Sequence, residues 1–152
     1  MLHPLKALRR ARPALLATTL VAASLVLAQA ATVLRADHPV IGTWRLDLPG
    51  GRCHEIYRIR RDGTTLVTSA AEVAETAFEV SDQPDAQGFF SWSDQIVRDN
   101  GQPDCSGEVT PVGQRVIQRL IFNPAGDMFL MCLPDDPQRC IGPFVRQEDD
   151  QA

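Results

Sequence analysis

The sequence predicts an all-β domain, folded as an antiparallel up-and-down β-barrel of about eight strands. Three observations favour this class: short runs rich in β-branched and aromatic residues recur, turn signals separate them, and no long helical pattern follows residue 40. Closure into a barrel removes both sheet edges, which otherwise invite aggregation. A domain spanning residues 40–147 is long enough to bury a core of its own.

The first predicted strand, residues 40–48, carries the pair Gly42 and Trp44. Both residues face the same side, because side chains alternate along a strand. A glycine inside a strand usually marks a bend or a close backbone approach. We therefore expect this strand to curve while it places a large indole in the core, at one end of the barrel.

The remaining strands follow in order, each bounded by turn residues such as Asp62-Gly63, a typical hairpin turn. The stretch 70–75 has helical propensity, but the alternation along residues 74–80 favours a strand. Residues 148–152 form an acidic tail that we expect to fray. The predicted strands span residues 52–61, 64–71, 73–81, 89–97, 114–122, 128–133 and 141–146.

The first 30 residues have the pattern of a secretory signal peptide. An apolar stretch, residues 14–28, precedes the small-x-small site Ala28-Gln29-Ala30. Residues 31–39 then form a linker or N-terminal arm. The positive charges that precede the apolar stretch are Lys6, Arg9, Arg10 and Arg12.

The alternative is an uncleaved membrane anchor extending to about residue 34. Residues 14–34 carry no charge, and about 20 apolar residues are enough to span a bilayer. Because the positive end stays inside, both readings place the domain outside the cytoplasm. It is periplasmic or secreted, or else anchored to the inner membrane.

The charge of the exported part argues against a nucleic-acid partner. Eleven of the 15 basic residues and all 19 acidic residues follow residue 30, which gives a net charge of −8. Nucleic acids and anionic membranes bind basic faces instead. We expect membrane contact only through an uncleaved N-terminal segment. No cofactor signature is present.

All four cysteines lie in the exported part, and an even number there predicts two disulfides. Three pairings are possible. We favour Cys132 with Cys140, which flank a turn-rich loop between two predicted strands, and therefore Cys53 with Cys105. A zinc site is disfavoured, because no Cys-x-x-Cys motif exists and only two histidines follow residue 30.

Aromatic residues supply the candidate ligand contacts. Phe90 and Trp92 share one face of their predicted strand. Together with Tyr57 they are our candidate ligand-binding residues, since a small barrel can enclose one ligand. The same rings, like those of the apolar run 128–131, can instead fill the barrel solidly.

Two carboxylates, Glu55 and Glu72, lie closest to predicted strands. They can do acid–base work, or lie inside a barrel against Arg58 or Arg115, but we expect them on the solvated surface. His54 faces the opposite side of the strand from Glu55, so the two form no dyad.

No catalytic arrangement stands out. The segment Asp104-Cys105-Ser106-Gly107 has no nearby histidine to activate a nucleophile. We interpret it as a disulfide-pinned turn and expect a protein that is not an enzyme.

The residues Gly42-Thr43-Trp44, the eight-strand meander and Arg146 on the last strand resemble the lipocalins and the wider calycin group. This resemblance implies that Arg146 packs across the Trp44 ring at the closed end of the barrel. It also implies a non-catalytic binding module that holds an apolar or amphiphilic small molecule in the barrel or at its mouth.

A looser likeness points to a protein partner instead. Trp44-x-Leu46 followed by Cys53 is similar to the start of the small periplasmic inhibitors of secreted metalloproteases. That resemblance implies that Ala31 to Val40 enters a protease cleft. The long loop from Asp99 to Gly107 is a second possible contact for a protein partner.

Overall fold

The computed structural model describes residues 33–148. The predicted signal peptide or anchor and the last four residues of the acidic tail lie outside this range. Within it, no helix is long and apolar enough to cross a membrane.

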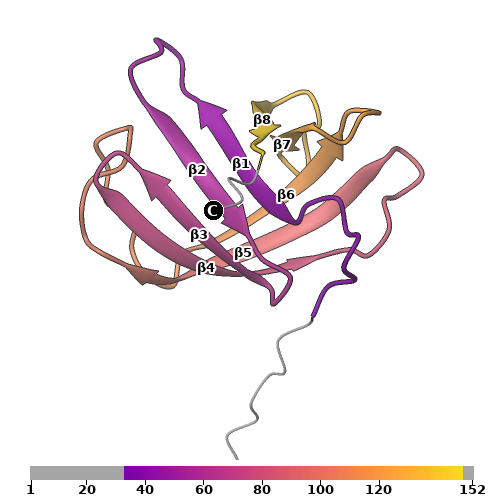
Figure 1. Ribbon diagram of the computed structural model, residues 1–152, viewed down its shortest axis with the longest axis horizontal. Helices are drawn as coiled ribbons and strands as arrows, with labels where there is room; N and C mark the ends of the chain where they lie inside the picture. Colours follow the sequence, from indigo (N-terminus) through magenta and orange to yellow (C-terminus); the bar gives the residue numbers. More distant parts are fainter. Residues whose placement is uncertain (1–32, 149–152) are drawn as a thin grey trace, which may run out of the picture.

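Eight antiparallel strands close into one barrel, each hydrogen-bonded to the next in the chain, and the last returns to the first. Figure 1 shows β8 beside β1 where the barrel closes. The strands are β1 (Gly42–Asp47), β2 (His54–Ile59), β3 (Thr64–Ser69), β4 (Glu72–Val80), β5 (Phe89–Asp99), β6 (Arg115–Phe122), β7 (Met128–Cys132) and β8 (Cys140–Arg146).

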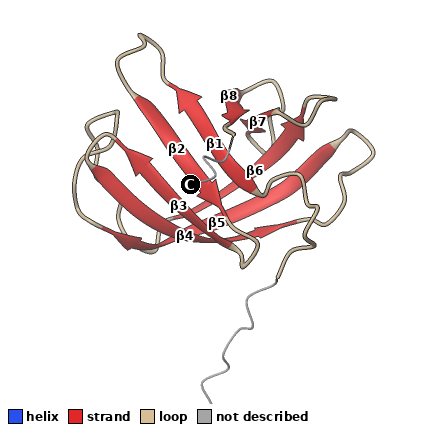
Figure 2. Ribbon diagram, viewed as in Figure 1, coloured by secondary structure: helices blue, strands red, loops and turns tan. Residues whose placement is uncertain are grey.

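The predicted fold class is confirmed, and each predicted strand is present within about two residues at its ends. No helix occurs between residues 33 and 148 (Figure 2). The stretch with helical propensity forms a turn at Ala70 and Ala71, and Ala70 takes a positive φ of 52°. Strand β4 begins directly after this turn, so the alternating pattern decides the structure here.

The barrel interior is packed with rings at its closed end. Trp44, Phe129 and Phe144 are completely or almost completely buried. The Trp44 and Phe129 ring centroids lie 4.7 Å apart, and those of Phe129 and Phe144 lie 4.6 Å apart. This packing follows from the alternation along each strand, which turns every second side chain inward.

The chain before β1 and the end of β8 seal this end. The Arg146 guanidinium carbon lies 4.1 Å from the Trp44 ring centroid. Its nitrogens donate to the carbonyl oxygens of Ile41, Pro39 and Gly126 at 2.9, 2.7 and 3.3 Å. The indole itself donates to the Val40 carbonyl at 2.8 Å. The guanidinium–indole contact is the one that the lipocalin resemblance implies for Trp44 and Arg146.

Gly42 makes the close approach possible. It takes a φ of +138°, and a β-carbon at this position would lie 2.5 Å from Arg146 Nη1. Any larger residue would therefore push the guanidinium away from the indole while also straining the backbone.

The opposite end of the barrel, which we call the mouth, carries the loops that join β1 to β2, β3 to β4, β5 to β6 and β7 to β8. Both predicted disulfides are confirmed, and both lie at this end. Cys53–Cys105 ties the start of β2 to the β5–β6 loop, and Cys132–Cys140 joins the facing ends of β7 and β8.

Candidate functional site

Acidic and polar side chains replace rings on the inner wall of the barrel near the mouth. The register pairs Leu46 with Glu55, Glu55 with Ser69, and Ser69 with Glu72, so these side chains share the inner face with buried Leu46. We call Glu55, Tyr57, Glu72, Asp94 and Asp99, on β2, β4 and β5, the carboxyl wall.

Glu55 is held by two hydroxyl donors. The Tyr57 hydroxyl donates to Glu55 Oε2 at 2.6 Å, and the Ser69 hydroxyl donates to Glu55 Oε1 at 2.6 Å. The Ser69 oxygen also accepts a hydrogen bond from the backbone N–H of Cys105 at 3.0 Å. The pinned β5–β6 loop is thus bonded to the inner wall of the mouth, and the Glu55 carboxylate cannot turn freely.

Glu72 is the most buried carboxyl group of the wall, with 6 % of its surface exposed. Burial raises the pKa of Glu72 to about 7, and the neighbouring Asp99, Asp104 and Glu55 carboxyl groups add to the rise. Neither Glu72 Oε1 nor Asp99 Oδ2 accepts a hydrogen bond from a residue between 33 and 148. A hydrogen bond between these two carboxyl groups therefore requires a proton on one of them.

The other members of the wall are shifted for the same reason. Burial raises the pKa of Asp94. Burial and then the charge of Glu55 hold the pKa of the Tyr57 hydroxyl well above its usual range. The inner face of β2, β4 and β5 near the mouth thus disfavours further negative charge.

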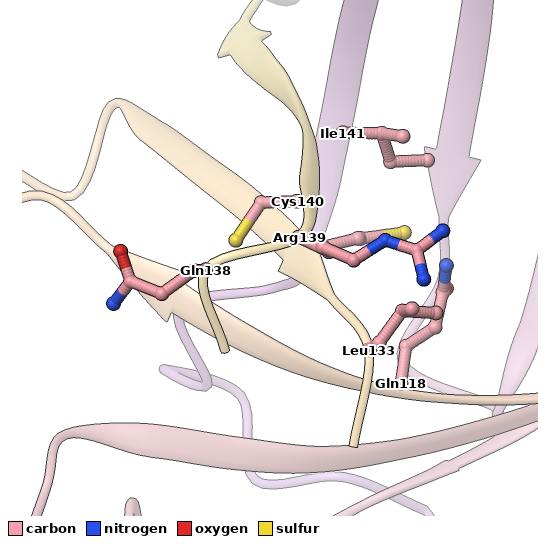
Figure 3. Close-up of a pocket in the computed structure, with 7 residues that line it drawn as sticks. Gln118, Leu133, Gln138, Arg139, Cys140 and Ile141 are labelled. Atoms are coloured by element: carbon pink, nitrogen blue, oxygen red, sulfur yellow. The ribbon is translucent and has the colours of Figure 1, made fainter. Parts of the chain in front are cut away.

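A hollow of about 370 Å³ opens at the same end, on the side of β6, β7 and β8. Inward-facing Gln118 and Met131 line it, and Ile141, which pairs with Met131, is 51 % exposed there. Figure 3 shows Arg139 on the rim, with its side chain extending toward Gln118. Gln118 pairs with Trp92, and the adjacent Val116 pairs with Asp94, so the hollow borders the carboxyl wall at β5.

The three residues predicted to bind a ligand all lie in the core cluster or pack against it. Phe90 and Trp92 are 7 and 3 % exposed. Phe90 packs against His38 and Phe122, and Trp92 stacks on Phe78 with ring centroids 4.3 Å apart. Tyr57 is half-buried and belongs to the carboxyl wall.

The expectation that Glu55 and Glu72 lie on the solvated surface is wrong, most clearly for the buried Glu72. Both face the barrel interior, but neither meets Arg58 or Arg115, which are exposed. Sequence reasoning also missed Asp94 and Asp99. A signal for Asp94 was present, since it continues the alternation of Phe90 and Trp92 along one face.

A second hollow, of about 430 Å³ and almost wholly apolar, lies on the outer face of β6 to β8. Its lining includes Ile121, Met128, Leu130 and Pro143. It shares no lining residue with the mouth hollow, although Phe122 and Phe129 of the core form part of its floor.

Between residues 33 and 148, no three His, Cys, Asp or Glu side chains are grouped so as to hold a metal ion.

No family model, curated protein or solved structure matches this chain. The likeness to lipocalins accordingly rests on the eight-strand antiparallel barrel and on the Gly42, Trp44 and Arg146 arrangement. The two disulfides are typical of proteins in an oxidising compartment outside the cytoplasm.

Proposed function

We propose that this domain is an exported, non-catalytic binding module that holds an amphiphilic small molecule at the mouth of its barrel. The observation that carries the proposal is the difference between the two ends. One end is filled by rings and sealed by Arg146, whereas the other has a hollow beside a partly buried polar wall.

The mouth offers both parts that such a site needs. Met131 and Ile141 supply apolar surface, while Gln118 and the carboxyl wall supply a few polar groups that fix orientation. The disulfides hold the surrounding loops in place, so the site is largely formed before a ligand arrives.

The protease-inhibitor alternative gains no support from the N-terminal arm. Leu34 exchanges hydrogen bonds with Arg61, the imidazole of His38 bonds to the Ser81 carbonyl at 3.1 Å, and Val40 is completely buried. The arm from Leu34 to Val40 therefore packs on the barrel itself. A segment that enters a partner's cleft would need these contacts to break.

The test is a titration of the purified domain with a neutral fluorescent probe, N-phenyl-1-naphthylamine. We expect saturable binding to one site, with a dissociation constant in the micromolar range. Ile141→Asp should weaken binding at least fivefold, because it places a charge in the apolar part of the hollow.

The matched control is Val145→Asp, on the same strand but paired with Arg45 on the outer face and 38 % exposed. Probe binding should be unchanged in this variant. Absence of saturable binding, or an equal loss in both variants, would rule out a site at the mouth.

A further inference from the structure

We propose that the ligand carries an ammonium group, and that the carboxyl wall of β2, β4 and β5 receives it. This inference rests on the proposed binding function and names the chemical class that the same site takes.

The first argument is the absence of an ion pair to the carboxyl wall among residues 33–148. The ion pairs of the described residues join Arg35, Arg45, Arg60, Arg98 and Arg119 to acidic residues outside the carboxyl wall. No carboxyl group of the wall takes part in them. Buried carboxylates are normally paired or neutralised by a proton, because a lone charge in a poorly solvated place is costly.

The second argument is the pair of oxygens without a donor. Glu72 is 94 % buried, and its Oε1 has no hydrogen-bond partner among the residues that the structure describes. The same holds for Asp99 Oδ2 on the adjacent strand. A proton shared between these two carboxyl groups makes one hydrogen bond. An ammonium group satisfies both oxygens and brings the missing positive charge, since it has three donors and no acceptor.

The nearby residues complete the site for an organic cation. Glu55 has its carboxylate fixed by Tyr57 and Ser69, so it stands ready without further ordering. The apolar tail of the ligand then lies in the hollow against Met131 and Ile141.

Arg139 sets the orientation. It lines the hollow, its side chain extends toward Gln118, and it repels a positive group placed in the hollow. An amphiphilic cation thus binds with its charged end toward β2 to β5 and its tail toward β6 to β8. Arg139→Gln should raise the affinity for such a ligand about two- to threefold.

Binding should depend on pH through Glu72. The titratable groups that face it are Glu55 on β2, Asp99 on β5 and Asp104 in the β5–β6 loop. The ammonium group replaces the proton that Glu72 holds, so binding releases a proton at pH values below about 7. Affinity should therefore rise as the pH increases from 5 to 8.

The experiment compares three ligands with the same tail: octylammonium chloride, 1-octanol and sodium octanoate, each titrated calorimetrically at pH 5, 6, 7 and 8. The amine stays protonated throughout, as a lysine amine does. We expect octylammonium to bind at least tenfold more tightly than the other two at pH 8, and its advantage to shrink at pH 5.

Glu72→Gln should lower the octylammonium affinity about tenfold and remove its pH dependence between 5 and 8. Glu79→Gln, on the same strand but exposed on the outside, is the matched control and should change neither. Circular dichroism and urea unfolding of both variants establish that the barrel is intact.

The outcomes separate the two proposals. Equal binding of the three octyl compounds, or tighter binding of octanoate, would overturn the ammonium class and leave the binding function standing. Absence of binding by all three, together with failure of the neutral probe, would overturn both. A pH dependence that persists in Glu72→Gln would remove Glu72 from the recognition of the cation.

Discussion

The Arg146 guanidinium lies over the indole of Trp44, with 4.1 Å between the guanidinium carbon and the ring centroid, and the two residues pair across β1 and β8. The contact joins the first strand to the last at the point where the barrel closes. Because Arg146 also holds the carbonyls of Pro39 and Ile41, it fixes the entry of the chain into β1.

Replacing Arg146 should therefore destabilise the whole barrel. Arg146→Met removes three hydrogen bonds to backbone carbonyls and the cation–π contact, which together are worth about 2–4 kcal/mol. The loss in the free energy of unfolding is measured by urea unfolding, with tryptophan fluorescence as the signal. The control Arg58→Met, at an exposed position on β2, should change the free energy of unfolding by less than about 0.5 kcal/mol. Equal losses of stability in the two variants would contradict a role of Arg146 in closing the barrel.

Gly42 gives a second test of the same end. Gly42→Ala should cost about 2–4 kcal/mol of stability, because the new β-carbon meets Arg146 Nη1 in a backbone conformation that is already strained for alanine. Gly113→Ala is the control: its φ is also positive, at +92°, but nothing lies within 4 Å of an added β-carbon. It should cost only about 1 kcal/mol. Thermal unfolding of the two variants would contradict this account if Gly113→Ala were the less stable.

The two disulfides should contribute unequally. Cys53–Cys105 closes a loop with a sequence separation of 52, and Cys132–Cys140 one of 8. In the chain-entropy model, removing the first costs about 4 kcal/mol and removing the second about 2.5 kcal/mol. Double serine variants of each pair, compared by chemical denaturation, test the order. A larger loss from the short loop would show that native contacts, and not chain entropy, dominate.

Stability should depend on pH through Glu72. Burial raises the pKa of Glu72 in the folded protein to about 7, above the ordinary glutamate value of 4.5. Below about pH 4.5 both states are protonated, and the burial carries no charge penalty. As the pH rises from 4.5 to 7, the unfolded chain ionises first, so stability falls, and the loss persists above pH 7.

Glu72→Gln should remove this dependence. The variant gains stability relative to the wild type by roughly 1–3 kcal/mol between pH 4.5 and 8. Thermal unfolding at several pH values measures the gain, with Glu79→Gln as the exposed control. A difference between wild type and Glu72→Gln that does not vary with pH would exclude a raised pKa.

The sequence predicted the strands well because turn residues and alternation are local signals. It also predicted the pairing of Cys132 with Cys140, since facing strand ends bring short-range cysteines together. The carboxyl wall was harder to predict. Glu72 lies just before the predicted strand, although the alternation of Ala74, Thr76 and Phe78 extends back to it.

Asp99 shows a physical limit of such reasoning. Asp94 and Trp92 face inward by simple alternation, but Asp99 is five residues after Asp94 and would face outward in a regular strand. The register between β4 and β5 shifts at Glu75 and Thr76, and Ala74 pairs with Asp99. This irregularity turns Asp99 to the inner face. The hollow likewise depends on how distant strands close, which no local pattern contains.

The disulfide between Cys53 and Cys105 also affects how firmly the mouth of the barrel is held. The backbone N–H that anchors Ser69, and through it Glu55, belongs to one of the bonded cysteines. While the two thiols remain reduced, as in a newly made chain, no covalent link fixes this anchor. The mouth of the barrel is then held by hydrogen bonds without the disulfide. Formation of this disulfide therefore adds a covalent link to the hydrogen bonds that hold the mouth of the barrel.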